Sequence, residues 1–265
     1  MTRSILSALS GFPEVPYDVG YVWRFGNEDA PHDALPIEAA LSRTIEHVRS
    51  ELPRLAGVKE NASGFVEKTV GNTLRVDFVR AIYPEAKYVY VLRNGLDVVE
   101  SAIRSWKARP SIPYLLRKSR TFSWRRAPRY ATRYARSTAT RILGLSKTVK
   151  TWGPQYPGIH EDVKLLPLSE VCAKQWAASV ESLHGALPYF KADQLLVLRF
   201  EEMVSEPRRA GERLASFLTM RSQLEAEEVV TSIMDRSSLN RGPLENEARV
   251  REIVSHAMDI WGYTT

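Results

Sequence analysis

The sequence predicts an α/β protein in which helices flank a mainly parallel β-sheet. Short apolar runs of strand type at 87–92 ("KYVYVL") and 194–200 ("QLLVLRF") are each followed by a segment with helical spacing. Such alternation of buried strands and helices is typical of parallel sheets. The chain has 265 residues, enough for a sizeable core, and we expect residues 1–265 to form a single domain.

The first half of the chain is expected to supply helices and one further strand. Ile5, Leu6 and Leu9 would line one face of the first helix. The expected elements are a helix over 2–9, a helix over 37–52 between Pro36 and Gly57, a short strand at 64–69 ("GFVEKT") and a helix within 72–84 that Pro84 stops.

The second half is expected to be mostly helical around the strand at 194–200. A helix over 97–106 would carry Asp97 and Glu100 near its positive end. The other expected elements are a Pro/Gly-rich loop at 152–158 ("WGPQYPG"), a long helix over 168–187 and a helix over 206–218.

Charge is spread unevenly along the chain, which has a net charge of +6 and a pI of about 9.4. Between Arg104 and Lys150 lie 14 of the 37 basic residues and no Asp or Glu, so the rest of the chain is mildly acidic. So many like charges would repel one another in a compact core. We therefore expect a basic helical or loop insert over 104–150 that faces an anionic acceptor or a membrane surface. A solvated basic loop is the alternative.

The cysteine content and the hydropathy of the chain limit where in the cell the protein is expected. The single cysteine, Cys172, excludes a disulfide within the chain, and nothing favours an oxidising compartment. No apolar run approaches the roughly 20 residues needed to cross a bilayer. We expect a cytoplasmic protein, with peripheral contact at the inner membrane face through the basic insert, and no nucleic-acid partner.

Arg93 is the first residue that points to chemistry, because it follows a buried strand. In open α/β sheets, ligands gather at the carboxyl ends of the strands. A guanidinium there can hold a phosphate through paired hydrogen bonds, and Ser101, eight residues on, would lie about one turn along the next helix. The same pattern also suits an arginine paired with a nearby carboxylate and a serine on a helix surface.

Three segments in order resemble the sulfotransferase family, in its bacterial carbohydrate- and lipid-modifying branch and the Golgi-type relatives. They are "FVEKTVGNTLR", "YVYVLRNGLDVVESAIRSW" and "LLVLRFEEMVSEPRRAGERLASFL", and the likeness covers roughly 58–218. The resemblance implies a fold related to P-loop kinases. It also implies 3′-phosphoadenosine 5′-phosphosulfate as the sulfuryl donor and no metal ion.

The resemblance also implies which residues hold the donor. Arg93 and Ser101 match the pair that binds its 3′-phosphate, and Arg241 lies where some members close a basic segment over the same phosphate. The family begins with a strand and a Gly/Ser/Thr-rich loop that wraps the 5′-phosphosulfate. Thr2, Arg3 and Ser4 match only the end of that loop. We therefore expect the natural protein to start upstream of Met1.

The catalytic groups follow from the same likeness. Lys68, in "EKT", would lie near the transferred sulfuryl group and neutralise its charge. An acceptor hydroxyl also needs a general base. Asp18 lies closest to the position of the carboxylate that the Golgi-type relatives use, and Glu14, Glu28 and His32 remain alternatives.

The sequence thus predicts a sulfotransferase that acts on a hydroxyl of a glycan, glycolipid or similar acceptor. A related P-loop kinase is disfavoured because the chain has no GxxxxGK[ST] motif. The other alternative is a non-catalytic, truncated relative that binds an anionic glycan or a membrane surface through the basic insert.

Overall fold

The computed structural model describes residues 2–17, 19–58, 64–107, 151–218, 223–233 and 242–263. Asp18, Arg241 and residues 108–150 of the basic insert lie outside these ranges. The elements in chain order are α1 (Thr2–Ser10), α2 (Gly20–Trp23), η1 (Ile37–Ala39), α3 (Ser42–Ala56), η2 (Val70–Leu74), α4 (Val76–Ile82), β1 (Tyr88–Leu92), α5 (Gly95–Lys107), α8 (Ile159–Leu165), α9 (Leu168–Ala186), η3 (Leu187–Tyr189), β2 (Leu195–Arg199), α10 (Phe200–Ser205), α11 (Pro207–Leu218), α12 (Gln223–Ile233) and α13 (Glu247–Ile260).

The sheet of the described residues consists of β1 and β2, which run parallel. Their register pairs Tyr88 with Leu195 and Leu92 with Arg199, so the two strands end side by side. The expected α/β class with a parallel sheet is therefore confirmed in its coarse form, although the fold is mostly helical. The residues that follow the two strands, Arg93 and Phe200, leave the sheet at the same edge.

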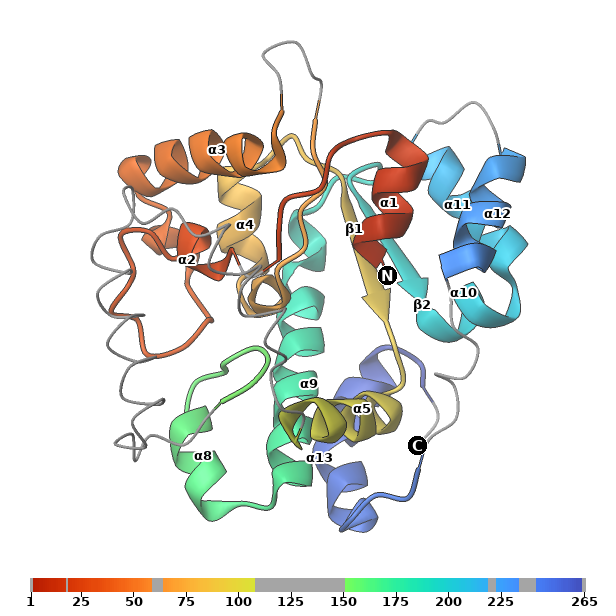
Figure 1. Cartoon of the computed structure of the whole chain (residues 1–265). Helices are drawn as coiled ribbons and strands as arrows, with labels where there is room; N and C mark the ends of the chain where they lie inside the picture. The colour runs from red at the N-terminus through yellow and green to blue at the C-terminus, as the bar shows by residue number, and fades with distance from the viewer. Residues whose placement is uncertain are drawn as a thin grey trace.

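Helices cover both faces of this small sheet (Figure 1). Alternate residues of a strand point to opposite faces. Val89 and Val91 accordingly pack into a cluster with residues of α1, α11 and α12, whereas Tyr90 packs with residues of α9 and α13 on the other face. In Figure 1 the first turn of α1 is the end of that helix nearest the arrowheads of β1 and β2. The carboxyl edge of the sheet is therefore where helix starts and strand ends come together.

The segment 64–69 does not form the strand that its composition predicts. It makes a single parallel bridge, in which Glu14 lies opposite Val66. The amide of Val15 donates to the carbonyl of Val66, and the amide of Val66 donates to the carbonyl of Pro13. The amide of residue 13 would extend the ladder toward residue 64, but Pro13 has no N–H group to donate.

Two predicted helices have other bounds than expected. The helix expected over 37–52 begins only at Ser42, after the separate turn η1, and continues to Ala56. Ile37 and Leu41, which precede it, are 43% and 49% exposed. The helix within 72–84 is interrupted at Arg75, whose backbone is not helical. The helices expected over 2–9, 97–106, 168–187 and 206–218 are all present.

The described part of the chain contains no helix that is both long and apolar enough to cross a membrane. Within those same ranges, no three side chains of His, Cys, Asp or Glu are grouped so that they could hold a metal ion.

Candidate active site

The Arg93 loop, residues 93–95, joins β1 to α5 and is held from both sides. The indole Nε1 of Trp176 donates to the carbonyl of Arg93 over 3.2 Å. The next amide, that of Asn94, donates to Oε1 of Glu201 over 2.8 Å. Trp176 belongs to α9 and Glu201 to α10, so two separate helices fix the peptide bond that follows Arg93.

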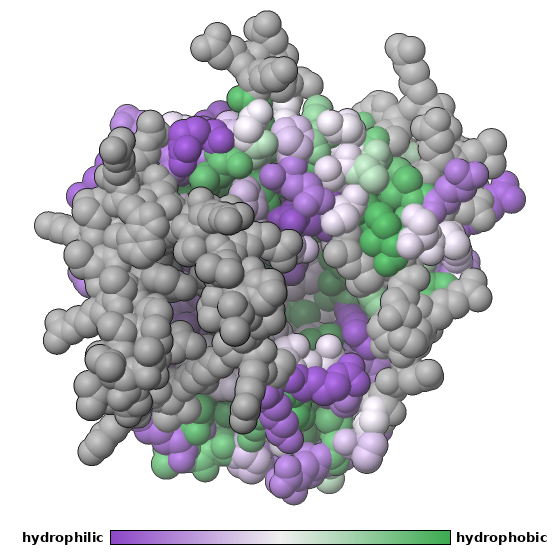
Figure 2. Space-filling view, viewed as in Figure 1, coloured by the Kyte–Doolittle hydropathy of each residue, from purple (hydrophilic) through white to green (hydrophobic). Residues whose placement is uncertain are grey.

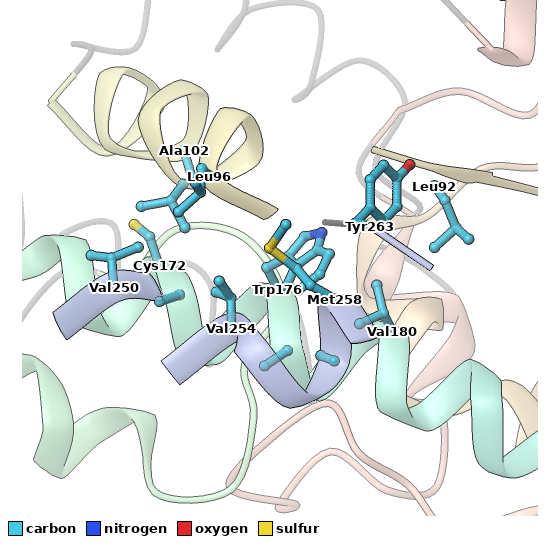
Figure 3. Packing of buried hydrophobic residues seen from close by; sticks show 14 residues of the cluster. Leu92, Leu96, Ala102, Cys172, Trp176, Val180, Val250, Val254, Met258 and Tyr263 are labelled. Carbon is cyan, nitrogen blue, oxygen red and sulfur yellow. The ribbon is translucent and has the colours of Figure 1, made fainter. Parts of the chain in front are cut away.

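The loop also fixes the start of α5. The side-chain oxygen of Asn94 accepts a hydrogen bond of 2.9 Å from the amide of Leu96, as a helix-capping residue does. Gly95 packs directly against Trp176, since a Cβ on Gly95 would lie 2.9 Å from the indole ring. Figure 3 shows Trp176 among the buried residues of α5, α9 and α13 that support the loop.

The Arg93 guanidinium lies over the ring of Phe200, with 4.6 Å between its central carbon and the ring centroid. A cation placed over an aromatic face is attracted by the ring electrons. Because Phe200 follows β2 as Arg93 follows β1, the register of the two strands creates this contact. The charge of Arg93 is therefore held at the carboxyl edge of the sheet, where the sequence predicts an anion site.

Ser101 lies on the same strand–loop–helix unit, in the second turn of α5, and is half-buried. Its neighbour Glu100 lies close to Gly242, because a Cβ on Gly242 would be 3.7 Å from Oε1 of Glu100. Arg241 itself is outside the described residues. Gly242, the residue after it, lies beside α5, the helix that carries Ser101.

Figure 2 shows that this face of the molecule is hollowed near the carboxyl end of β1, above α5, with hydrophobic residues visible in the hollow. Hydrophilic residues lie along its lower rim.

The Lys68 loop, residues 67–69, presents an exposed lysine between two hydrogen-bonded neighbours. The carboxylate of Glu67 accepts from the hydroxyl of Thr69 over 2.5 Å and from the side-chain amide of Asn72 over 3.2 Å. Burial raises the pKa of the Glu67 carboxyl, and the hydrogen bond from Thr69 opposes that rise. Glu67 therefore ties Lys68 to the following turn, η2.

A buried arginine continues this polar network. Arg75 is 2% exposed, and its Nε donates to the side-chain oxygen of Asn72 over 2.8 Å. Its guanidinium lies 3.8 Å from the carboxylate of Asp33, which also accepts from Arg24 over 3.0 Å. The other oxygen of Asp33 accepts from the backbone amide of Gln155 over 2.9 Å. The network thus connects the Lys68 loop to two other loops through hydrogen bonds and ion pairs.

At the start of α1, Arg3 forms an ion pair with Glu14 that the sequence does not predict. The guanidinium of Arg3 lies 2.8 Å from the carboxylate of Glu14, donates to the carbonyl of Val15 and lies over the ring of Tyr17 at 3.7 Å. Arg3 is 8% exposed. Thr2 and Ser4 flank it in the first turn of the helix.

The candidates for the general base lie in different surroundings. Glu14 is the residue paired with Arg3, and its bridge to Val66 places it near the Lys68 loop. Oε1 of Glu28 accepts from the amide of Gly26 over 3.0 Å, and the backbone carbonyl of His32 accepts from Arg24 over 3.0 Å. Asp18 is outside the described residues, between Tyr17 and Val19.

Comparison with known proteins decides the family. The model of a family described as "Sulfotransferase domain" matches residues 79–243, which is more than half of the chain and includes β1, the Arg93 loop, α5 and β2. The chain belongs to the sulfotransferase family. The resemblance to the sulfotransferase family is thereby confirmed, and the matched range contains the second and third of the three segments. The family places the protein among transferases that move sulfuryl groups.

This sulfotransferase was also compared with solved structures and with curated proteins. Among solved structures, the chain is similar to a protein described as "Sulfotransferase Domain from the Curacin Biosynthetic Pathway", with a TM-score of 0.47 and 12% sequence identity over 99% of this chain and 92% of that chain. No curated protein matches the sequence.

Sequence reasoning missed the residues that support Arg93. Trp176 has the burial of an ordinary core residue, but its indole N–H also donates to the Arg93 carbonyl. The contact between Glu201 and the Asn94 amide joins residues 107 positions apart. No local pattern signals such contacts. The available signal was that "RFEEM" follows the neighbouring parallel strand and so ends at the same edge of the sheet.

Proposed function

We propose that this sulfotransferase moves a sulfuryl group from 3′-phosphoadenosine 5′-phosphosulfate to a hydroxyl of a glycan, glycolipid or similar acceptor. The observation that carries the proposal is the placement of Arg93. It follows a buried parallel strand, its peptide is fixed by Trp176 and Glu201, and the helix carrying Ser101 starts two residues later. A fixed guanidinium beside a helix start suits a phosphate group.

The 3′-phosphate of the donor is proposed to bind Arg93 and Ser101, with Arg241 closing from the segment that reaches Glu100. The position of Gly242 beside Glu100 supports this assignment. We also infer that the unit β1, Arg93 loop and α5 is part of a P-loop-like sheet, within one domain formed by residues 1–265.

The 5′-phosphosulfate is proposed to lie at the first turn of α1, near Thr2, Arg3 and Ser4. Support comes from the orientation of α1, whose N-terminal end is the end nearest the strand arrowheads in Figure 1. Unpaired N–H groups at a helix start favour anions. Arg3 is paired with Glu14, so it would contribute to donor binding only by exchanging or sharing that partner.

Sulfuryl transfer of this kind is an in-line displacement. The acceptor oxygen forms a bond to sulfur while the bond between sulfur and the 5′-phosphate oxygen breaks, and the hydroxyl proton passes to a base. Lys68 is proposed to neutralise the charge on the peripheral oxygens, and Asp18 is proposed to take the proton. Glu14, Glu28 and His32 are the alternatives for the base, and the proposal uses no metal ion.

The acceptor is proposed to meet the basic insert over 104–150. Its 14 positive charges suit an anionic glycan or an anionic lipid surface, and we place the activity in the cytoplasm with peripheral contact at the inner membrane face. Binding to anionic vesicles and to sulfated or carboxylated glycans at low and moderate salt tests this part. Absence of binding at low salt would contradict it.

The function is tested by incubating the protein with the donor and panels of hydroxylated glycans and glycolipids, followed by mass spectrometry for the sulfated product and for 3′-phosphoadenosine 5′-phosphate. We expect both products to appear together. Binding of the donor with no transfer to any acceptor would favour a non-catalytic relative. Absence of donor binding would contradict the proposal.

A further inference from the structure

Three consecutive residues, the last residue of β2 and the two that follow it, reach two different segments of the chain. The guanidinium of Arg199 donates to the carbonyls of Trp261 and Gly262 over 2.7 and 3.2 Å. The ring of Phe200 lies under the guanidinium of Arg93. Glu201 then accepts from the Asn94 amide with one carboxylate oxygen. The structure therefore joins the segment after α13 to the Arg93 loop through this short stretch.

The second oxygen of Glu201 completes this connection. Oε2 accepts a hydrogen bond of 3.0 Å from the hydroxyl of Tyr263, whose ring also lies 4.6 Å from the guanidinium carbon of Arg199. Tyr263 is 8% exposed, and Figure 3 shows it beside Leu92, the last residue of β1. Burial raises the pKa of the Tyr263 hydroxyl, so it stays protonated and continues to donate at neutral pH.

We propose that Tyr263 is a positioning residue for Arg93, acting through Glu201. The inference rests on the proposed function, because it assigns to Tyr263 a role in binding the 3′-phosphate of the donor without touching it. It makes the segment after α13 part of the support of the donor site.

The physical reason is that a carboxylate beside a phosphate site must be held in place. A carboxylate near Arg93 would compete with a bound phosphate for the guanidinium if it could rotate toward it, and donors on both of its oxygens hold it in place. The Asn94 amide and the Tyr263 hydroxyl fill these two places. Without the hydroxyl, Glu201 can rotate, the bond to the Asn94 amide weakens, and the peptide after Arg93 loses one of its two fixed points. Contacts to a phosphate are sensitive to such small displacements.

The test compares Tyr263→Phe with Tyr156→Phe. Both substitutions remove a tyrosine hydroxyl that donates to a carboxylate. The hydroxyl of Tyr156 donates to Asp162 in a hydrogen bond of 2.6 Å, and neither residue belongs to the Arg93 loop. Titration calorimetry with 3′-phosphoadenosine 5′-phosphate should show affinity about tenfold lower for Tyr263→Phe and unchanged for Tyr156→Phe. Affinity for adenosine 5′-phosphate, which lacks the 3′-phosphate, should be unchanged in both.

Two more measurements separate positioning from a loss of stability. Glu201→Gln keeps an oxygen for the Asn94 amide and should retain more affinity than Glu201→Ala. Amide hydrogen exchange of a peptide covering 93–98 should become faster in Tyr263→Phe and stay unchanged in Tyr156→Phe. In an Arg93→Ala background, Tyr263→Phe should cause no further loss of affinity.

The outcomes distinguish this inference from the proposed function. If the unsubstituted protein does not prefer the nucleotide with the 3′-phosphate, the proposed function fails. If it has that preference and Arg93→Ala removes it, but Tyr263→Phe behaves like Tyr156→Phe in affinity and exchange, the positioning role alone is overturned.

Discussion

The Arg93 loop and the Lys68 loop are fixed in opposite ways. The Arg93 loop is backed by the apolar cluster of α5, α9 and α13, and its backbone is held by Trp176 and Glu201. The Lys68 loop is held by a polar network of Glu67, Asn72 and Arg75, and the side chain of Lys68 is exposed. In the proposed mechanism Arg93 binds the donor in the ground state, whereas Lys68 stabilises charge that develops in the transition state. Substitutions in the two loops should therefore act on different steps.

Asp18→Asn should have the largest effect on turnover, because a general base contributes about 10²- to 10⁴-fold to the rate of proton transfer. Donor affinity should stay unchanged. Single-turnover transfer from the donor, measured beside a nucleotide titration, separates the two quantities. Full activity of Asp18→Asn would show that another group is the base, and Glu14, Glu28 and His32 would be substituted next.

Lys68→Ala should lower turnover by about 10²-fold or more, the size expected for losing a group that stabilises charge in the transition state. The affinity for 3′-phosphoadenosine 5′-phosphate should change little. Lys191→Ala, an exposed lysine before β2, is the control and should leave both quantities unchanged. Equal losses in affinity and turnover for Lys68→Ala would remove the proposed difference between the two loops.

Gly95→Ala should weaken both folding and nucleotide binding, because its Cβ would lie 2.9 Å from the ring of Trp176. Overpacking of this kind costs about 1–3 kcal/mol in the free energy of unfolding. Gly185→Ala is a matched control on α9, the helix of Trp176, where a Cβ meets no atom within 4 Å. Chemical denaturation of both variants, followed by nucleotide titration, checks the prediction. A Gly95→Ala variant as stable as Gly185→Ala would mean that Trp176 does not fix the loop.

Ser101→Ala should have the smallest effect, a loss of about 1 kcal/mol in nucleotide binding, or about fivefold in affinity. Ser105→Ala, one turn farther along α5, removes a hydroxyl that donates to the carbonyl of Ser101 and should leave affinity unchanged. Titration calorimetry resolves a difference of this size. Equal affinities for the two variants would place the phosphate away from Ser101.

Local patterns in the sequence were enough to predict the unit of strand, arginine and helix. The apolar run of β1 and the spacing in α5 are properties of neighbouring residues, and both elements lie where they were expected. The prediction of a strand at 64–69 was wrong, because the partner segment cannot extend the pairing at Pro13, which has no N–H group. The apolar residues of 64–69 give no sign of this limit.

The contacts that support the site could not be predicted in the same way. Trp176 and Arg93 are 83 positions apart, and Glu201 and Tyr263 are 62 positions apart. Which side chains meet at the edge of a sheet depends on the order and register of its strands and on the packing of α9 and α13. The pairing of Arg3 with Glu14 likewise depends on the turn after α1.

The central claim is that Arg93 holds the 3′-phosphate of a nucleotide donor. It is tested most directly by comparing the affinities for 3′-phosphoadenosine 5′-phosphate and adenosine 5′-phosphate in the unsubstituted protein and in Arg93→Ala. Loss of a charged, paired hydrogen-bonding contact should cost about 2 kcal/mol or more, or about 30-fold in affinity. We predict that the unsubstituted protein prefers the nucleotide with the 3′-phosphate and that Arg93→Ala removes this preference while the affinity for adenosine 5′-phosphate is retained. Equal affinities for the two nucleotides in the unsubstituted protein, or a preference that survives in a folded Arg93→Ala variant, would contradict the claim.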